Sequence, residues 1–253
     1  MALTLHPASR PSIGFAAATD PVDAGIKEGP EAIGPDAPPG APPSELPLLP
    51  LRGVVLYPLM WLPITVGQPR SRRLLDDLSG RRQRHLLLAA SRDPDIEEPG
   101  ANDIFPVGVM AQVQRLMRLP DGNLRVIIQG IERVRITAFT TSEPYLQARF
   151  TLLPDRTTND AAEQALARTS QDLFASLVAL SPQLPNEMES AVRNAADSRQ
   201  QTYLIASSAG FKLDDAQSIL EADPLAGKLL RLNTLLQAEV EARELAQKIQ
   251  QEA

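Results

Sequence analysis

The 253-residue chain contains no cysteine, which excludes disulfide bonds, thiolate nucleophiles and cysteine-ligated metal sites together. It has only two histidines, His6 and His85, and they do not have the close spacing of a metal-ligand pair. Aromatic residues make up 4% of the chain, so its core has to be built mainly from Leu, Val, Ile and Ala. These shortages leave little material for a metalloenzyme or a thiol enzyme.

Long apolar runs are also missing from the sequence. None approaches the ~20 residues that a membrane-spanning helix needs, and the N-terminal segment lacks the apolar core of a secretory signal. Because Arg10 precedes the first acidic residue, Asp20, an organelle transit peptide stays open as an alternative for that segment. The net charge of -6 does not favour contact with phosphate backbones. We therefore expect a cytoplasmic protein that binds neither membranes nor nucleic acids.

The sequence also lacks motifs for phosphate binding and for nucleophilic catalysis. Gly227-Lys228 has neither the upstream glycine nor the following Ser or Thr of a phosphate-binding loop. Ser207 and Ser208 have no adjacent base and no Gly-x-Ser-x-Gly turn. The acidic loop 93–98 lacks the ligand spacing of a calcium loop. We therefore expect no catalytic, cofactor-binding or metal-binding residue, and no enzyme activity in this chain as given.

Residues 1–44 are rich in Pro, Ala and Gly, and we predict a disordered leader there. Residues 45–155 read as short strands with one helix. Asp121-Gly122 lies between two apolar runs and predicts a hairpin, because the turn needs positive φ. Arg133 and Arg135 alternate with apolar neighbours, which indicates half-exposed antiparallel strands. Several such strands suggest a small closed or nearly closed β-barrel.

The first predicted strand of this region, residues 46–52, contains two prolines. Pro47 and Pro50 cannot donate hydrogen bonds to a neighbouring strand, so we expect this strand to lie at an edge or to bulge.

Helical spacing of apolar residues begins after Pro154, and residues 156–222 predict an α-helical bundle. Asn159 is a plausible N-cap for the first helix and Ser198 for a later one, which Gly210 would end. Residues 223–253 predict one long helix that begins at Asp223-Pro224 and has no stop signal. Its buried face is a stripe of five residues: Leu225, Leu229, Leu232, Leu236 and Val240.

The end of this long helix is polar nearly all round, with Glu239 and Arg243 at ion-pairing distance along the helix. About 28 residues would reach roughly 40 Å, which is more than a small bundle needs. We therefore expect the helix either to bridge to something outside this region or to pair with a neighbour.

Apolar residues at turn-like positions are the remaining candidates for a functional surface. Two groups stand out, one before the second strand and one at the hairpin: Tyr57, Leu59, Met60 and Trp61, then Leu116, Met117 and Leu119. Methionine adapts to varied partners, so one interpretation is an apolar surface that grips unfolded polypeptide. The other interpretation is that both groups pack the barrel.

Five stretches of the sequence together carry a family resemblance: LPLLPLRGVVLYP (46–58), PITVGQPRS (63–71), FPVGVMAQVQRLMRLPDGNLRVIIQGIERVRI (105–136), EPYLQARFTLLPD (143–155) and AQSILEADPLAGKLLRLNTLLQAEVE (216–241). They resemble the N-terminal, substrate-binding domain of the Lon family of ATP-dependent serine proteases (endopeptidase La). The resemblance covers residues 46–253 and omits only the leader. It implies an α+β fold, with a partly open β-barrel followed by an α-helical bundle that ends in a long helix.

The resemblance also implies a function. In the Lon family this region recognises and holds misfolded or degron-bearing substrates and supports a homohexamer for protein quality control. In the family, the module that uses ATP and Mg and the Ser-Lys peptidase dyad both lie downstream of this region. No catalytic residue can therefore be carried over to this chain. A stand-alone adaptor or structural module with a Lon-type fold and no attached protease is the alternative. The reading frame beyond codon 253 would distinguish the two.

Overall fold

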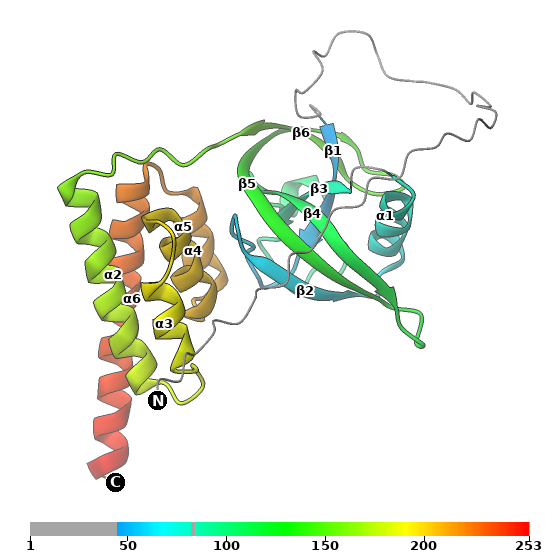
Figure 1. The fold of residues 1–253 in the computed structure, drawn as a ribbon. Helices are drawn as coiled ribbons and strands as arrows, with labels where there is room; N and C mark the ends of the chain where they lie inside the picture. Colours follow the sequence, from blue (N-terminus) through cyan, green and yellow to red (C-terminus); the bar gives the residue numbers. More distant parts are fainter. Residues whose placement is uncertain (1–44, 82–83, 253) are drawn as a thin grey trace, which may run out of the picture. The chain divides into compact units, whose positions relative to one another are not determined.

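A six-stranded sheet that curls back on itself occupies the first part of the fold (Figure 1). The computed structural model describes residues 45–81 and 84–252, so the predicted leader lies outside the described residues. The strands follow the order β2-β5-β4-β3-β1-β6, and β5 also pairs with β6. Their bounds are β1 Glu45–Leu51, β2 Trp61–Val66, β3 His85–Ala90, β4 Val107–Arg118, β5 Leu124–Thr141 and β6 Gln147–Leu152. The predicted partly open barrel is therefore a ring of strands, with β2 added to β5.

The ring closes because β5 is long enough to pair with two different parts of the sheet. Its first residues pair with β2, while residues 134–141 pair with β6 across two register shifts that bend the strand. The predicted hairpin joins β4 to β5. Gly122 has φ of 82° there, and the amide of Asn123 donates to Asp121 Oδ1 at 3.0 Å. The prediction of a turn at Asp121-Gly122 is confirmed.

The strand β1 does not lie at an edge, contrary to the expectation from its prolines. Residues 48–51 pair in parallel with β3, and residues 45–47 pair antiparallel with β6. Each neighbour covers only part of β1, so the two ladders share the strand, and the missing N–H groups do not prevent it from pairing on both sides. Both faces of β1 and β3 are buried, in two separate apolar clusters, which explains their nearly continuous apolar sequences.

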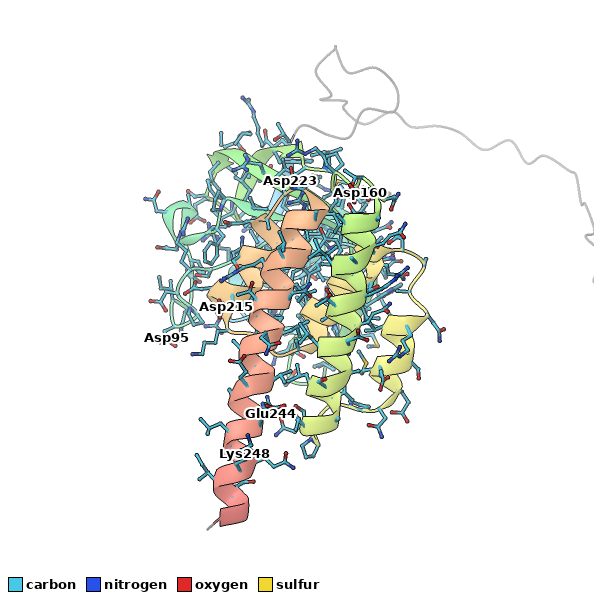
Figure 2. All side chains as sticks on the ribbon, turned by 90° about the vertical axis from the view of Figure 1, so that its left-hand side faces the viewer. Asp95, Asp160, Asp215, Asp223, Glu244 and Lys248 are labelled. Carbon is cyan, nitrogen blue, oxygen red and sulfur yellow. The ribbon has the colours of Figure 1, made fainter. Side chains whose placement is uncertain are left out.

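Helices make up most of the rest of the described chain. They are α1 Pro69–Ser79, α2 Ala161–Leu180, α3 Glu187–Arg193, α4 Ser198–Ser208, α5 Leu213–Glu221 and α6 Leu225–Glu252, with a short 3-10 helix at Ala101–Asp103. Figure 2 shows α2 and α6 side by side, with Asp160 and Asp223 near their starts at the same end. One apolar core joins the sheet to α2, α4, α5 and α6.

Two helices begin one residue away from the predicted caps. Asp160 caps α2, because its Oδ1 accepts the amide of Glu163 at 2.8 Å, whereas Asn159 has φ of 52° outside the helix. Asp197 caps α4 in the same way. An aspartate carboxylate is a stronger acceptor for these free amides than the neighbouring Asn or Ser. Gly210 follows the end of α4 with φ of 73°, as predicted.

The long helix α6 buries the predicted stripe of leucines and Val240. Its last turns are exposed, and Figure 2 labels Glu244 and Lys248 on them. Arg243 does not use Glu239 as its partner. Its Nη1 donates instead to Ser181 Oγ at 2.9 Å, just after the end of α2, so the tertiary contact replaces the predicted pair within the helix.

A buried cluster of charged side chains joins the ring to the helices. At its centre is Asp155, between β6 and α2, whose side chain is 0% exposed. Arg133 Nε of β5 lies 2.8 Å from Asp155 Oδ1. Arg199 Nε of α4 lies 2.7 Å from Oδ2, and the Tyr203 hydroxyl donates to the same oxygen at 2.5 Å. The Nε–H of Arg133 is not aligned as a hydrogen bond, so that contact is primarily an ion pair. One carboxylate thus ties the sheet to α4.

The burial of Arg133 corrects the prediction that it is half-exposed. Arg135 is exposed, but Arg133 is 2% exposed. Its Nη1 donates to the carbonyl oxygens of Leu220 at 2.9 Å and Ala222 at 3.2 Å, at the end of α5. Alternation along a strand reveals which residues share a face, but it does not reveal that helices cover that face.

We expect Asp155→Asn to lower the free energy of unfolding by about 3–5 kcal/mol, because it removes the buried carboxylate that Arg133 and Arg199 share. Denaturant titration measures this change. Asp76→Asn is the matched control, since it breaks the exposed Asp76–Arg118 pair, whose atoms lie 2.6 Å apart. That pair should contribute less than about 1 kcal/mol. Equal small losses in both variants would show that the buried cluster does not hold the fold.

Candidate functional site

The segment from Arg52 to Met60 connects β1 to β2, and two backbone hydrogen bonds attach its final turn to β5. The amide of Leu59 donates to the carbonyl of Gly130, and the amide of Gly130 donates to the carbonyl of Met60, each at 2.9 Å. Leu59 has φ of 68° in this turn, and Gly53 has the same value at the start of the segment. The segment is therefore fixed against β5 rather than free to adapt along its whole length.

Tyr57 anchors the middle of this segment to the helices. Its side chain is 1% exposed, its hydroxyl donates to the carbonyl of Ala216 at 2.9 Å, and its ring stacks on Tyr203 at 5.5 Å. Burial raises the pKa of the Tyr57 phenol far above its ordinary value. The prediction that Tyr57 offers its ring to a partner is wrong, because a long-range hydrogen bond and a stacking partner hold it inside.

A hollow of about 150 Å³ lies where this segment meets α4 and α5, and we call it the loop–helix hollow. Val54 and Val55 line it from the segment, and Ser207 and Phe211 line it from the helical side. Ser207 Oγ also lies 3.7 Å from the sulfur of Met60, in a weak hydrogen bond. Since most of the lining is apolar, an apolar side chain could enter this hollow without leaving a buried charge unpaired.

A second hollow lies on the other side of the same segment, and we call it the strand hollow. Its volume is about 240 Å³, and it lies between the end of β1 and the second half of β2. Pro50 and Ile64 contribute apolar surface, while Arg52 and Gln68 contribute polar groups. Val54, which is 36% exposed, lines both hollows. The two hollows are therefore neighbours, separated by one short stretch of chain.

Trp61 stands at the end of the segment with 57% of its surface exposed. It begins β2, opposite Gln129 of β5. Gln129 accepts a hydrogen bond from Gln114 Nε2 at 2.9 Å, so a row of amide side chains lies across the sheet from the indole. An exposed indole beside hydrogen-bonding amides suits contact with a polypeptide, which offers both apolar side chains and amide groups.

The candidates at the hairpin lie away from this segment. Leu116, Met117 and Leu119 are half-buried, and Leu116 packs against the core. Met117 pairs with Arg125, which pairs on its other side with Thr65 at the far end of β2. The structure therefore brings Leu59, Met60 and Trp61 together but separates them from the hairpin group by most of the length of β2.

Val54, Val55 and Phe211 line a hollow but are absent from the candidates that the sequence suggested. The two valines lie outside both apolar groups that the sequence suggested, and Phe211 lies more than 150 positions away along the chain. The only local signal is a pair of glycines, Gly53 and Gly210, which border the hollow and adopt positive φ.

Lys228 of the Gly-Lys pair is 0% exposed and points into the junction, so it does not fit a phosphate site. Residues 45–81 and 84–252 contain no group of three or more acidic or histidine side chains that could hold a metal ion. In the same residues, no helix is long and apolar enough to cross a membrane.

Comparison with known proteins decides the family. A family model described as the ATP-dependent protease La (LON) substrate-binding domain matches residues 45–238. The chain belongs to the Lon family. Lon protease 1 of Herpetosiphon aurantiacus is 35% identical over 211 residues, which make up 82% of this chain and 26% of that protein. The Lon protease of Escherichia coli is 30% identical over 205 residues, 81% of this chain and 26% of that protein.

Solved structures agree on the fold. The N-terminal domain of a Mycobacterium avium complex Lon protease has a TM-score of 0.60 at 21% identity, covering 76% of this chain and 98% of that one. A Lon N-terminal domain protein from Xanthomonas campestris has a TM-score of 0.50 at 16% identity, covering 74% and 96%. The match covers nearly the whole of the solved Mycobacterium avium complex domain and about three quarters of this chain. The chain spans about a quarter of the length of the curated Lon proteases.

We expect Gly130→Ala to destabilise the fold by about 1–3 kcal/mol, because the added Cβ would overlap the backbone carbonyl of Tyr57. It should also disturb the segment before β2. Trp61 is the single tryptophan, so its fluorescence reports both the unfolding transition and the local change. Gly227→Ala in α6 is the control, since its Cβ would meet only Pro224 Cδ at 3.8 Å. We expect it to be neutral or to stabilise the helix by up to ~1 kcal/mol. Equal stability of the two variants would contradict the close approach at Gly130.

Proposed function

We propose that this chain is the substrate-recognition region of an ATP-dependent Lon protease and that it binds exposed apolar segments of misfolded or degron-bearing proteins. The observation that carries the proposal is the pair of hollows that share Val54, together with the exposed indole of Trp61 at the end of the same segment. Membership of the Lon substrate-binding family supports it.

The size and lining of the hollows support apolar segments as the bound species. A volume of about 150 Å³ holds on the order of ten water molecules. Release of such waters from apolar surface by an entering aliphatic or aromatic side chain would favour binding. Folded proteins bury most side chains of this kind, so a site that accepts them selects unfolded segments.

The construction of the surface supports tolerance of many sequences. Met60 has an adaptable side chain, and the amides of Gln114 and Gln129 can donate or accept hydrogen bonds with any peptide backbone. The residues that line the loop–helix hollow carry no charged side chain, so this hollow does not demand one particular partner residue.

The proposal extends to the protein as a whole. The matched region makes up about a quarter of the Lon proteases that the chain resembles, so we place the ATP- and Mg-dependent unfolding and the Ser-Lys cleavage in modules outside this chain. We further propose a homohexamer that acts in cytoplasmic protein quality control. A cysteine-free sequence is compatible with that compartment.

We expect Trp61→Ala to weaken binding of an unfolded polypeptide about tenfold, because aromatic residues at the centre of a contact surface often contribute 1–2 kcal/mol or more. Fluorescence anisotropy with labelled, reduced and carboxymethylated lactalbumin measures the affinity. Thermal unfolding should change little, since the indole is more than half exposed.

Leu245→Ala provides a matched control, because Leu245 is 60% exposed but lies near the end of α6, away from the hollows. It should leave both affinity and stability unchanged. Met117→Ser asks whether the hairpin group also contributes to binding. If Trp61→Ala lost stability and affinity in equal measure, or if Leu245→Ala weakened binding as much, the proposed site would be wrong.

A further inference from the structure

Lys228 is completely buried in the junction between the ring and the helices. Its Nζ donates to the carbonyl oxygens of Ile219 at 2.7 Å and Leu220 at 3.1 Å, which are among the last carbonyls of α5. The same atom lies 3.7 Å from Asp155 Oδ1 and 5.3 Å from the centre of the Tyr203 ring. One amine thus contacts α5, α4 and the segment that connects β6 to α2.

The charges around Lys228 are already balanced without it. The ion pairs of the junction join the carboxylates of Asp155, Asp223 and Glu132 to the guanidinium groups of Arg133, Arg199 and Arg156. Each carboxylate therefore has a guanidinium partner. A protonated Lys228 would add a fourth cation to these three anions, and its side chain, like that of Asp155, is 0% exposed, whereas Asp223 and Glu132 are partly exposed.

The hydrogen bonds of Lys228 do not require a charge. A neutral amine has two N–H bonds, and the two carbonyl acceptors use both. The two nearby helix dipoles act in opposite directions, because the first turn of α6, where Lys228 lies, disfavours a positive charge, whereas the last carbonyls of α5, which its Nζ meets, favour one. Burial and the balance of the surrounding charges are what favour the neutral form in the closed junction.

We propose that Lys228 is a pH-sensitive latch: as the neutral amine it holds the helices against the ring, and its protonation loosens that junction. Burial first, and then the charge of Arg133, lower the pKa of Lys228 to about 7, although Asp155 and Asp223 act in the opposite direction. The change of state therefore falls near neutral pH. Histidine is the ordinary group that titrates there, but the described chain has only His85, at the start of β3.

The direction in which pH changes the stability of the fold follows from whether the folded or the unfolded chain binds more protons. Between about pH 7 and 10.5, the ordinary pKa of a lysine, the unfolded chain keeps the lysine proton and the folded chain does not. Stability therefore rises with pH through this range, by up to about tenfold in the folding equilibrium per pH unit. The gain is lost as pH falls to about 7. Burial raises the pKa of Tyr57 and Tyr203, so these phenols affect stability only at higher pH.

The latch has a consequence for binding, and this consequence alone rests on the proposed function. The loop–helix hollow is lined on one side by the segment before β2 and on the other by α4 and α5. Loosening of the junction would therefore widen the hollow, and lower pH would change its affinity for apolar segments.

The first experiment observes the proton directly in the wild-type chain. The protein has four lysines, Lys27, Lys212, Lys228 and Lys248, so 15N-lysine labelling gives few side-chain resonances. We expect one Nζ resonance to titrate near pH 7 between pH 6 and 9.5, and to be missing in Lys228→Met. A Lys228 resonance that stays protonated through pH 9.5 would overturn the proposal, even if the variant failed to fold.

The second experiment observes the junction, and the absence of cysteine makes the labelling unambiguous. Thr137→Cys on β5 and Arg168→Cys on α2 place dyes on exposed positions of the two sides for fluorescence energy transfer. We expect the distance distribution to broaden as pH falls from 9 to 6, and Lys228→Met to abolish that response. His85→Gln should keep it. A response that survives in Lys228→Met, or that disappears in His85→Gln, would refute the latch. Neither experiment uses a substrate, so either can fail while the proposed binding site stands.

Discussion

The placement of the helices depends on one buried carboxylate. Asp155 follows the last strand of the ring, and its two oxygens lie against groups from β5 and α4. An unpaired carboxylate would be very costly in this position, because burial removes it from water. The arrangement is stable only while Arg133, Arg199 and Tyr203 all surround it. Helices that moved away from the ring would break several of these contacts at once, so the cluster gives the joint between ring and helices a definite geometry that apolar packing alone would specify less strictly.

The candidate site depends on the same joint. The segment before β2 is attached to the ring through Gly130 and to the helices through Tyr57, whose hydroxyl reaches Ala216. Tyr57 also stacks on Tyr203, one of the groups around Asp155. The wall of the loop–helix hollow and the buried carboxylate are therefore linked by two adjacent aromatic rings. The loop–helix hollow lies across this joint, so it keeps its shape only while the ring and the helices keep the same position relative to each other.

Sequence patterns predicted the parts of this molecule that local rules determine. The hairpin at Asp121-Gly122, the buried stripe of α6 and the end of α4 at Gly210 each depend on residues close together in the chain, and each is confirmed. The family resemblance supplied the ring and bundle. What could not be predicted depends on long-range contacts. Arg133 read as a surface residue because nothing near it in the sequence announces α5 above it. Tyr57 read as exposed because its partner, Ala216, lies 159 positions away. Phe211 escaped notice for the same reason.

The charged joint also explains why an otherwise aliphatic protein buries so many ionisable groups. Replacing such a cluster with well-packed apolar residues often stabilises a protein, so stability alone does not account for it. A ring and a helical bundle that met only through leucines could slide, because aliphatic contacts are non-directional. Hydrogen bonds from Arg133 and Lys228 to the last carbonyls of α5 are directional, and they fix the end of that helix relative to β5. A domain that must hold one side of a hollow against the other gains from that directionality, and the amine within it makes the same joint responsive to protons.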